Sequence, residues 1–177
     1  LYICNKMAEN FTPGLTSIII PTRPRSKFAS VKTMIKKLYL LTDALDDISN
    51  NVSCPFEIVI ICNGNENDSF VDFIKNHSAI TKYAILSTNV GITRGMNIGV
   101  EMAEGEFLCI ANDDVEIGKN SIEKLIENLN KDGIGQVGLE GSMWYRQKPI
   151  EKVPNDKIRE VDTVAGYMFI VKRTVYD

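Results

Sequence analysis

The segment Asn112-Asp113-Asp114 has the side chains best suited to metal chemistry, two carboxylates and an amide directly after the apolar run Glu106–Ala111. Burying adjacent carboxylates costs free energy unless a cation compensates their charge. Carboxylate and amide oxygens suit Mg²⁺ or Mn²⁺, which takes one or two protein carboxylates and completes its coordination shell with phosphate and water. In extended backbone Asn112 and Asp114 point the same way, which leaves Asp113 to hold a sugar hydroxyl. A solvated turn before the helix predicted from Asn120 is the alternative.

A second polar segment, with Asn89 and Arg94, joins the predicted strand Tyr83–Ser87 to the predicted helix Thr93–Ala103. A guanidinium group binds a diphosphate in a bidentate way, and the amino end of a helix adds partial positive charge. Arg94 is therefore a candidate for binding a pyrophosphate group, with a solvent-facing helix arginine as the alternative. The sequence has no GxxxxGK(S/T) motif, which argues against a P-loop ATPase.

Short apolar runs rich in β-branched residues alternate with longer stretches of helical periodicity, which is typical of an α/β fold. Four buried parallel strands are predicted at Thr16–Pro21, Phe56–Cys62, Tyr83–Ser87 and Glu106–Ala111. In an open parallel sheet the ligand crevice lies beyond the carboxyl ends of the strands. The polar residues that follow these strands should therefore converge there: Thr22-Arg23, Asn63-Gly64-Asn65, Asn89 and Asn112-Asp113-Asp114.

The other elements are predicted from apolar spacing. Helices are expected over 28–41, 68–77, 93–103 and 122–129, the last with Asn120 and Glu123 as a capping box. The polar stretch Asp43–Ser53 is interpreted as a helix end and loop. Strands at Gln136–Glu140 and Val161–Val171 are expected to flank a loop over Trp144–Ile158.

Composition limits the class of protein. A chain of 177 residues and 19.8 kDa fits one domain. With 20 Lys and Arg against 23 Asp and Glu the formal charge is −3, without the basic block expected of a nucleic-acid-binding protein. No apolar run approaches the roughly 18 residues of a membrane span. The four irregularly spaced cysteines favour free thiols in a reducing cytoplasm.

The same polar segments, taken in order, resemble the family 2 glycosyltransferases of the GT-A fold. The matching segments are Ser17–Arg23, Glu57–Asn65, Asn89–Phe107 and Asn112–Asp114, and the resemblance covers nearly the whole chain. It implies a three-layer α/β/α fold with a mostly parallel central sheet. It also implies a single domain over 1–177, with an N-terminal extension at 1–14, a nucleotide-binding half at 15–115 and the start of an acceptor-binding half at 116–177. The start at Leu1 and the end at Asp177 predict a fragment truncated at its C-terminus.

The activity implied by this resemblance is an inverting sugar transfer from a UDP- or dTDP-type nucleotide sugar to a glycan or lipid-linked acceptor, in polysaccharide biosynthesis. Mn²⁺ or Mg²⁺ is the implied cofactor, bound at a DXD-like motif. The implied location is cytoplasmic, with peripheral membrane contact by the longer protein left open. One alternative is a catalytically degenerate sugar- or partner-binding module of the same fold. Another is a sugar-nucleotide pyrophosphorylase, although Thr22–Arg25 lacks the glycine-rich loop of that class.

On the donor side, the resemblance places Thr22 and Arg23 where the nucleoside is held. Asn63 stands where the family often has an aspartate that reads the uracil edge, and an amide both donates and accepts, so thymine or another base stays open. A plain β-turn at Asn63-Gly64 is the alternative. Asn89 and Arg94 belong to the nucleotide-sugar site.

For the metal site, the resemblance makes Asp114 the ligand and Asn112 the variable first residue of the motif, with Asp113 near the ribose or sugar. A single strong carboxylate ligand predicts weak metal affinity without nucleotide.

On the acceptor side, the run Val161–Arg173 resembles the strand in which a glycine, here Gly166, allows close approach of the acceptor; a bulge glycine is the alternative. Trp144 is a candidate for stacking on a sugar ring or for covering the core. The catalytic base is expected C-terminal to Asp177, so no residue is assigned to it.

Overall fold

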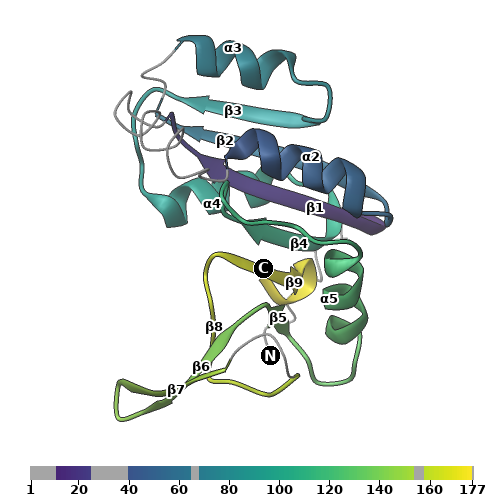
Figure 1. The fold of residues 1–177 in the computed structure, drawn as a ribbon, viewed down its shortest axis with the longest axis vertical. Coiled ribbons are helices and arrows are strands. Elements are labelled where there is room, and N and C mark those ends of the chain that lie inside the picture. Colours follow the sequence, from purple (N-terminus) through teal and green to yellow (C-terminus); the bar gives the residue numbers. More distant parts are fainter. Residues whose placement is uncertain (1–10, 25–39, 65–67, 154–157, 177) are drawn as a thin grey trace, which may run out of the picture.

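The computed structural model describes residues 11–24, 40–64, 68–153 and 158–176. Within them a central sheet of six strands has the order β3-β2-β1-β4-β9-β5 (Figure 1). The strands are β1 Thr12–Thr22, β2 Phe56–Asn63, β3 Lys82–Leu86, β4 Gly105–Ala111, β5 Gln136–Gly138 and β9 Met168–Lys172. The first four are parallel, and β9 runs antiparallel to β4 and β5. The predicted α/β fold with a mostly parallel sheet is confirmed.

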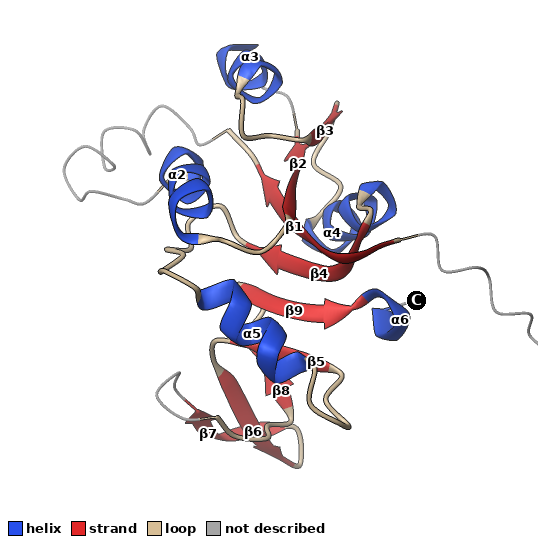
Figure 2. Cartoon of the chain, turned by 90° about the vertical axis from the view of Figure 1, so that its right-hand side faces the viewer, coloured by secondary structure: helices blue, strands red, loops and turns tan. Residues whose placement is uncertain are grey.

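Helices cover both faces of this sheet (Figure 2). The helices are α2 Leu41–Asn51, α3 Asp68–Asn76, α4 Ile92–Met102, α5 Ser121–Leu129 and the short α6 Arg173–Tyr176 after β9. Successive side chains of β1 point to opposite faces of the sheet. Ile18 and Ile20 therefore pack in the core under α2, α3 and α5, and Ile19 packs in the core under α4. All three isoleucines are fully buried, because this central strand is covered on both faces.

A smaller sheet of order β7-β6-β8 extends away from β5 (Figure 1). Its strands are β6 Gly141–Tyr145, β7 Lys148–Val153 and β8 Thr163–Val164. Positive φ angles of 47° at Arg146 and 65° at Gln147 form the tight turn of the β6–β7 hairpin. The predicted loop over Trp144–Ile158 is therefore wrong over β6 and β7, and the predicted strand Val161–Val171 is divided into β8 and β9. Almost every β7 residue is exposed, so this edge strand lacks the apolar pattern that identifies a strand in sequence.

Two helix predictions also need correction. Asp43–Ser53 is largely helical, because α2 buries a stripe at three- and four-residue spacing, Leu41, Ala44, Leu45 and Ile48. The predicted capping box of α5 does not form: Asn120 is left-handed, with φ 57° and no side-chain cap bond. The Glu123 carboxylate instead accepts hydrogen bonds from Ser53 N and Cys54 N at 2.5 and 3.0 Å. The helix predicted at 28–41 lies largely outside the described residues.

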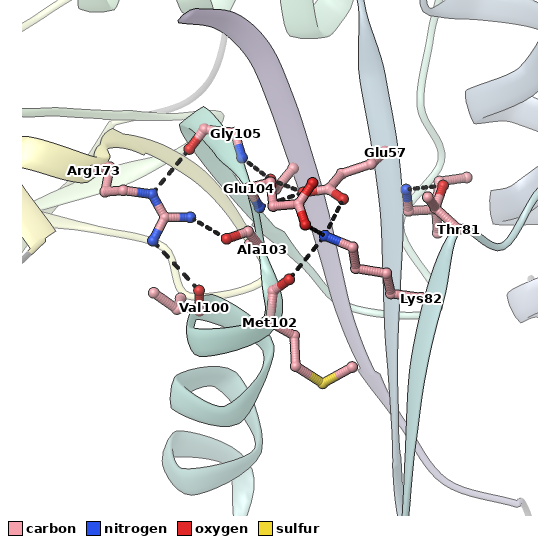
Figure 3. A network of polar contacts seen from close by, with 11 residues as sticks. Glu57, Thr81, Lys82, Val100, Met102, Ala103, Glu104, Gly105 and Arg173 are labelled. Atoms are coloured by element: carbon pink, nitrogen blue, oxygen red, sulfur yellow. Dashed lines mark hydrogen bonds and ion pairs between the residues drawn. The ribbon is translucent and has the colours of Figure 1, made fainter. Parts of the chain in front are cut away.

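A polar network around the buried Glu57 holds together the amino ends of the parallel strands (Figure 3). Glu57 Oε1 accepts from Ser17 Oγ at 2.6 Å and Glu104 N at 2.5 Å, and Glu57 Oε2 pairs with Lys82 Nζ at 3.0 Å. Lys82 also contacts Glu104 Oε1 at 2.8 Å and the carbonyl of Met102 at 3.1 Å. Burial alone would raise the pKa of Glu57, but these hydrogen bonds and the ammonium group hold it below its ordinary value.

The carboxyl end of α4 is fixed at the same edge. The Arg173 guanidinium donates to the carbonyls of Gly105 at 3.0 Å, Val100 at 3.5 Å and Ala103 at 2.7 Å (Figure 3). The carboxyl end of a helix has carbonyls without backbone partners, and a cation there also favours the helix dipole. Together with Lys82, Arg173 therefore ties α4 to the sheet.

Candidate functional site

The opposite edge of the sheet gathers the polar residues that the sequence places after the strands. The carboxyl ends of β1, β2, β3 and β4 lie there, at Thr22, Asn63, Leu86 and Ala111. β9 runs the other way, so its amino end pairs with the end of β4, Met168 with Ala111. The expected convergence of the strand ends on one edge is confirmed for the described residues.

Thr22 and Asp113 join the ends of two strands directly. Thr22 is 4% exposed, and its hydroxyl donates to Asp113 Oδ2 at 2.5 Å. Asp113 and Asp114 lie in a turn, and the extended backbone ends at Ala111, so the predicted alternation of side chains does not apply to them. Asp113 is therefore not fully available to a sugar, because one of its oxygens already accepts a hydrogen bond.

Asp114 is exposed and Asn112 is half-buried at the same edge. Asn112 N donates to the carbonyl of Tyr167 at 2.8 Å, which connects this turn to the start of β9. An exposed carboxylate beside a half-buried amide leaves hard oxygen donors at the surface of the edge, where a charged ligand can reach them.

Asn63 and Asn89 build the loop that precedes α4. Asn63 is 8% exposed; its Oδ1 accepts from Val90 N at 2.9 Å and its Nδ2 donates to Gly91 O at 3.1 Å. Asn89 Oδ1 accepts from Gly91 N at 2.9 Å. Gly91 is the N-cap of α4 with φ 86°, a conformation that favours glycine. The two asparagines thus fix the backbone at the amino end of α4.

Two arginines are exposed at this edge. Arg23 follows Thr22, and Arg94 lies in the first turn of α4. The partial positive charge at the amino end of α4 adds to theirs. The edge therefore pairs cationic groups near β1 and α4 with the carboxylates that follow β4, an arrangement suited to an anionic ligand that also carries hydroxyl groups.

The predicted acceptor residues lie in the small sheet and in the segment that leads from it to β9. Gly166 is exposed, and no atom lies within 4 Å of where a Cβ would be, so space does not require glycine there. Trp144 lies on β6, is 43% exposed, and donates from Nε1 to Thr163 Oγ1 at 2.9 Å. Trp144 therefore does not cover the core, and its ring is accessible from solvent.

The sequence matches the glycosyl transferase family 2 over residues 17–162. The chain belongs to this family. Among solved structures, the fold of this family 2 chain is similar to the mannosyltransferase PcManGT from Pyrobaculum calidifontis in complex with GDP-Man and Mn²⁺. The TM-score is 0.61 at 15% identity, over 94% of this chain and 46% of that one.

The family 2 chain is also similar to S. aureus TarS 1-349, with a TM-score of 0.58 and 18% identity over 89% of this chain and 46% of that one. The structure of TarS 1-349 in complex with UDP-GlcNAc gives the same TM-score at 16% identity, and the match covers 87% of this chain and 44% of that one. These likenesses show the GT-A fold, and the chain spans a little under half the length of each of these structures. No curated protein matches the chain. Among the described residues, no helix is long and apolar enough to cross a membrane.

The oxygen atoms at the carboxyl edge of the sheet are of the kinds that bind Mn²⁺ or Mg²⁺. Asn112, Asp113 and Asp114 supply carboxylate and amide oxygens, the ligands these cations prefer. The described residues contain no cluster of three or more His, Cys, Asp or Glu side chains arranged as a metal site. A cation here would draw most of its ligands from water and a bound ligand.

Tyr167 was missed by the sequence analysis. Its carbonyl holds Asn112, and its ring is half-buried at the carboxyl end of β4. Burial and the neighbouring Glu140 carboxylate raise the pKa of the Tyr167 hydroxyl. Its position inside an apolar run gave no signal for a role at this edge.

A glycine pattern that resembles a dinucleotide-binding motif occurs elsewhere, at Gly133, Gly135 and Gly138. These glycines follow α5 and lead into β5. A dinucleotide-binding motif joins a strand to the helix after it. This spacing is therefore not evidence for a dinucleotide site.

Proposed function

We propose that this chain binds the donor in a transfer of a sugar from a UDP- or dTDP-type nucleotide sugar to a glycan or lipid-linked acceptor. The observation that carries the proposal is the Thr22–Asp113 hydrogen bond. It joins Asp113, and with it the segment Asn112–Asp114, to the end of β1, on the edge where α4 begins. Residues 15–115 would form the nucleotide-binding half and residues 116–177 the start of the acceptor-binding half; the predicted extension over 1–14 is too long, because Thr12–Gly14 belong to β1.

The donor contacts fall into two groups. Thr22, Arg23 and Asp113 lie where the nucleoside and sugar hydroxyls bind, because a hydroxyl, a guanidinium and a carboxylate together offer donors and acceptors. Three residues serve the nucleotide from the other side: Asn63 at the end of β2, Asn89 in the loop before α4, and Arg94 in the first turn of that helix. Arg94 contacts the diphosphate, for which a planar guanidinium is well matched.

Asp114 and Asn112 would hold Mn²⁺ or Mg²⁺. When bound, the cation supplies positive charge beside the diphosphate that departs with the nucleotide. Because the described residues offer only these few oxygens, the cation is held weakly unless the nucleotide is present.

On the acceptor side, Gly166 leaves room for the incoming hydroxyl and Trp144 stacks on a sugar ring. Inversion at the anomeric carbon requires a base that takes the proton of the acceptor hydroxyl. We place this base C-terminal to Asp177. We also place the reaction in polysaccharide biosynthesis in the cytoplasm, with peripheral contact of the longer protein at a membrane.

The test is thermal unfolding with UDP, dTDP and GDP, each with and without Mn²⁺. A ligand at about 100 times its Kd adds about 2.7 kcal/mol to the free energy of unfolding. For a chain of this size that raises Tm by roughly 5 to 11 °C. We expect UDP or dTDP to give this shift only with Mn²⁺.

Two carboxylate variants make the test specific to the proposed metal ligand. Asp114→Ala should remove the Mn²⁺-dependent shift. Glu116→Ala, which removes an exposed carboxylate two positions further along, should keep it. A preference for GDP would contradict the donor type, an unchanged shift in Asp114→Ala would contradict the metal ligand, and no shift with any diphosphate would contradict the donor site.

A further inference from the structure

The carboxamide of Asn63 is built into the loop between β3 and α4. Val90 N can only donate and Gly91 O can only accept, so the two hydrogen bonds fix which way the amide points. Gly95, in the first turn of α4, lies beside Asn63, and a Cβ there would be in van der Waals contact with Asn63 Nδ2 at 3.5 Å. The amide is therefore enclosed between the loop and the helix, and the side chain as a whole is 8% exposed.

An amide suits this position and a carboxylate does not. A carboxylate accepts hydrogen bonds but cannot donate, so an aspartate here would keep the bond from Val90 N and set an oxygen against Gly91 O. Two acceptors facing each other in a buried position are unfavourable. Gly64, directly after Asn63, also lies against this loop: a Cβ added at Gly64 would lie 3.5 Å from Asn89 N.

What the loop holds in place is the start of α4. Gly91 is the N-cap of α4, its carbonyl accepts the first helical hydrogen bond from Gly95 N at 3.1 Å, and Arg94 follows within that turn. A shift of the loop at Val90 and Gly91 would therefore move the first turn and Arg94 with it.

We propose that Asn63 is a positioning residue: its carboxamide fixes Val90 and Gly91, and through them the first turn of α4 and Arg94, against a diphosphate group. This inference rests on the proposed function of the same edge and departs from a direct reading of the base by this side chain. It makes Asn63 a determinant of affinity for the diphosphate end of the donor, common to nucleotides with different bases.

The binding test uses titration calorimetry with UDP, GDP and inorganic pyrophosphate, each with Mn²⁺. The variants are Asn63→Ala, the isosteric Asn63→Asp, and Asn128→Ala as a matched control. Asn128 on α5 also donates one hydrogen bond and accepts another, to Lys124 O at 2.7 Å and from Lys131 Nζ at 2.6 Å. Circular dichroism verifies that each variant is folded.

Both Asn63 variants should weaken all three ligands by a common factor of about five or more, the equivalent of one lost hydrogen bond. The ratio of UDP to GDP affinity should stay within about twofold of the unsubstituted chain. Asn128→Ala should bind as the unsubstituted chain does. A changed base ratio with unchanged pyrophosphate affinity, or an Asn63→Asp variant that binds pyrophosphate normally, would overturn the proposal.

Amide hydrogen exchange tests the structural step without any ligand. The Val90 amide should exchange slowly in the unsubstituted chain and in Asn128→Ala, and rapidly in Asn63→Ala. Unchanged exchange at Val90 in Asn63→Ala refutes the positioning role. Failure of the unsubstituted chain to bind pyrophosphate or any nucleotide refutes the proposed function and the diphosphate role together, while exchange at Val90 still decides whether Asn63 holds the loop.

Discussion

Replacing Glu57 by Gln removes one negative charge from the amino edge of the sheet and leaves the shape of the side chain nearly unchanged. The remaining amide oxygen still accepts from Ser17 Oγ and Glu104 N. The new NH₂ group, however, faces Lys82 Nζ, which lies 3.0 Å from the carboxylate oxygen it replaces. An attraction between unlike charges becomes a contact between two donors.

The expected loss follows from the burial of the two partners. The Glu57 side chain is 5% exposed, and removing one partner of a buried ion pair costs about 3 to 5 kcal/mol. Lys82 is 25% exposed and keeps Glu104 and the Met102 carbonyl as partners, so the cost is reduced. We expect the free energy of unfolding to fall by about 2 to 3 kcal/mol, a drop in Tm of roughly 4 to 12 °C.

The assay is urea and thermal unfolding of the chain, with Glu104→Gln as the control. Glu104 contacts the same Lys82 ammonium at 2.8 Å, but its side chain is 66% exposed, so its loss should cost less than about 1 kcal/mol. If both variants lower the stability by the same small amount, burial of the Glu57 charge does not stabilise this edge and the reasoning fails.

The pH dependence gives a second readout for Glu57. Its pKa lies below the ordinary value in the folded chain, because hydrogen bonds and Lys82 outweigh the effect of burial. The unfolded state therefore takes up a proton first as the pH falls, and the stabilisation by Glu57 is present above the ordinary glutamate pKa and lost below it. Glu57→Gln should show a flatter loss of stability in acid, and an unchanged acid profile would contradict this assignment.

Two further predictions concern the packing of the core. Gly99→Ala should lower the free energy of unfolding by about 1 to 3 kcal/mol, because the new Cβ would clash with the side chain of Ile19. Urea unfolding measures this, with Gly118→Ala as the control, since no atom lies within 4 Å of a Cβ at Gly118. Equal urea midpoints for the two variants would contradict the close packing of α4 on β1. Burial raises the pKa of the Cys109 thiol to about 12, so iodoacetamide at neutral pH should label Cys109 only after unfolding. Peptide mass spectrometry checks this, with the half-buried Cys54 as a comparison, and a native label on Cys109 would refute it.

The central strands could be predicted from sequence because the sheet is covered on both faces. β1 is buried over its last seven residues and β2 over all but its first, so both appear in the sequence as apolar runs rich in β-branched residues. Elements with one exposed face were harder to identify. The seven polar residues of α2 outnumber its four buried ones and suggested a loop, and β7 exposes five of its six residues.

The sequence could predict where the candidate site lies, but not which of its side chains contact one another. Once four strands are parallel, their carboxyl ends must share one edge, which places Thr22, Asn63 and Asn112 together. Which side chains bind one another depends on partners far apart in the sequence: Thr22 and Asp113 are 91 positions apart, and Asn63 and Val90 are 27 apart. The local pattern left Asp113 to hold a sugar hydroxyl, and the family resemblance put Asn63 at a position that reads the base, with a plain β-turn as the alternative. In the structure both side chains already form hydrogen bonds within the protein.

The segments that resemble family 2 divide between the two edges of the sheet, and the two groups have different physical roles. Ser17, Glu57 and Gly105 lie at the amino edge, where Gly105 N donates to Ser17 Oγ at 2.8 Å and a Cβ on Gly105 would lie 2.6 Å from the carbonyl of Leu15. Helix α4 spans from this edge to the other, tied by Arg173 at its carboxyl end and by Asn63 at its amino end. Much of the sequence pattern therefore specifies how the edges are held together, and substitutions at the amino edge should change stability, whereas the residues of the proposed donor site lie at the carboxyl edge.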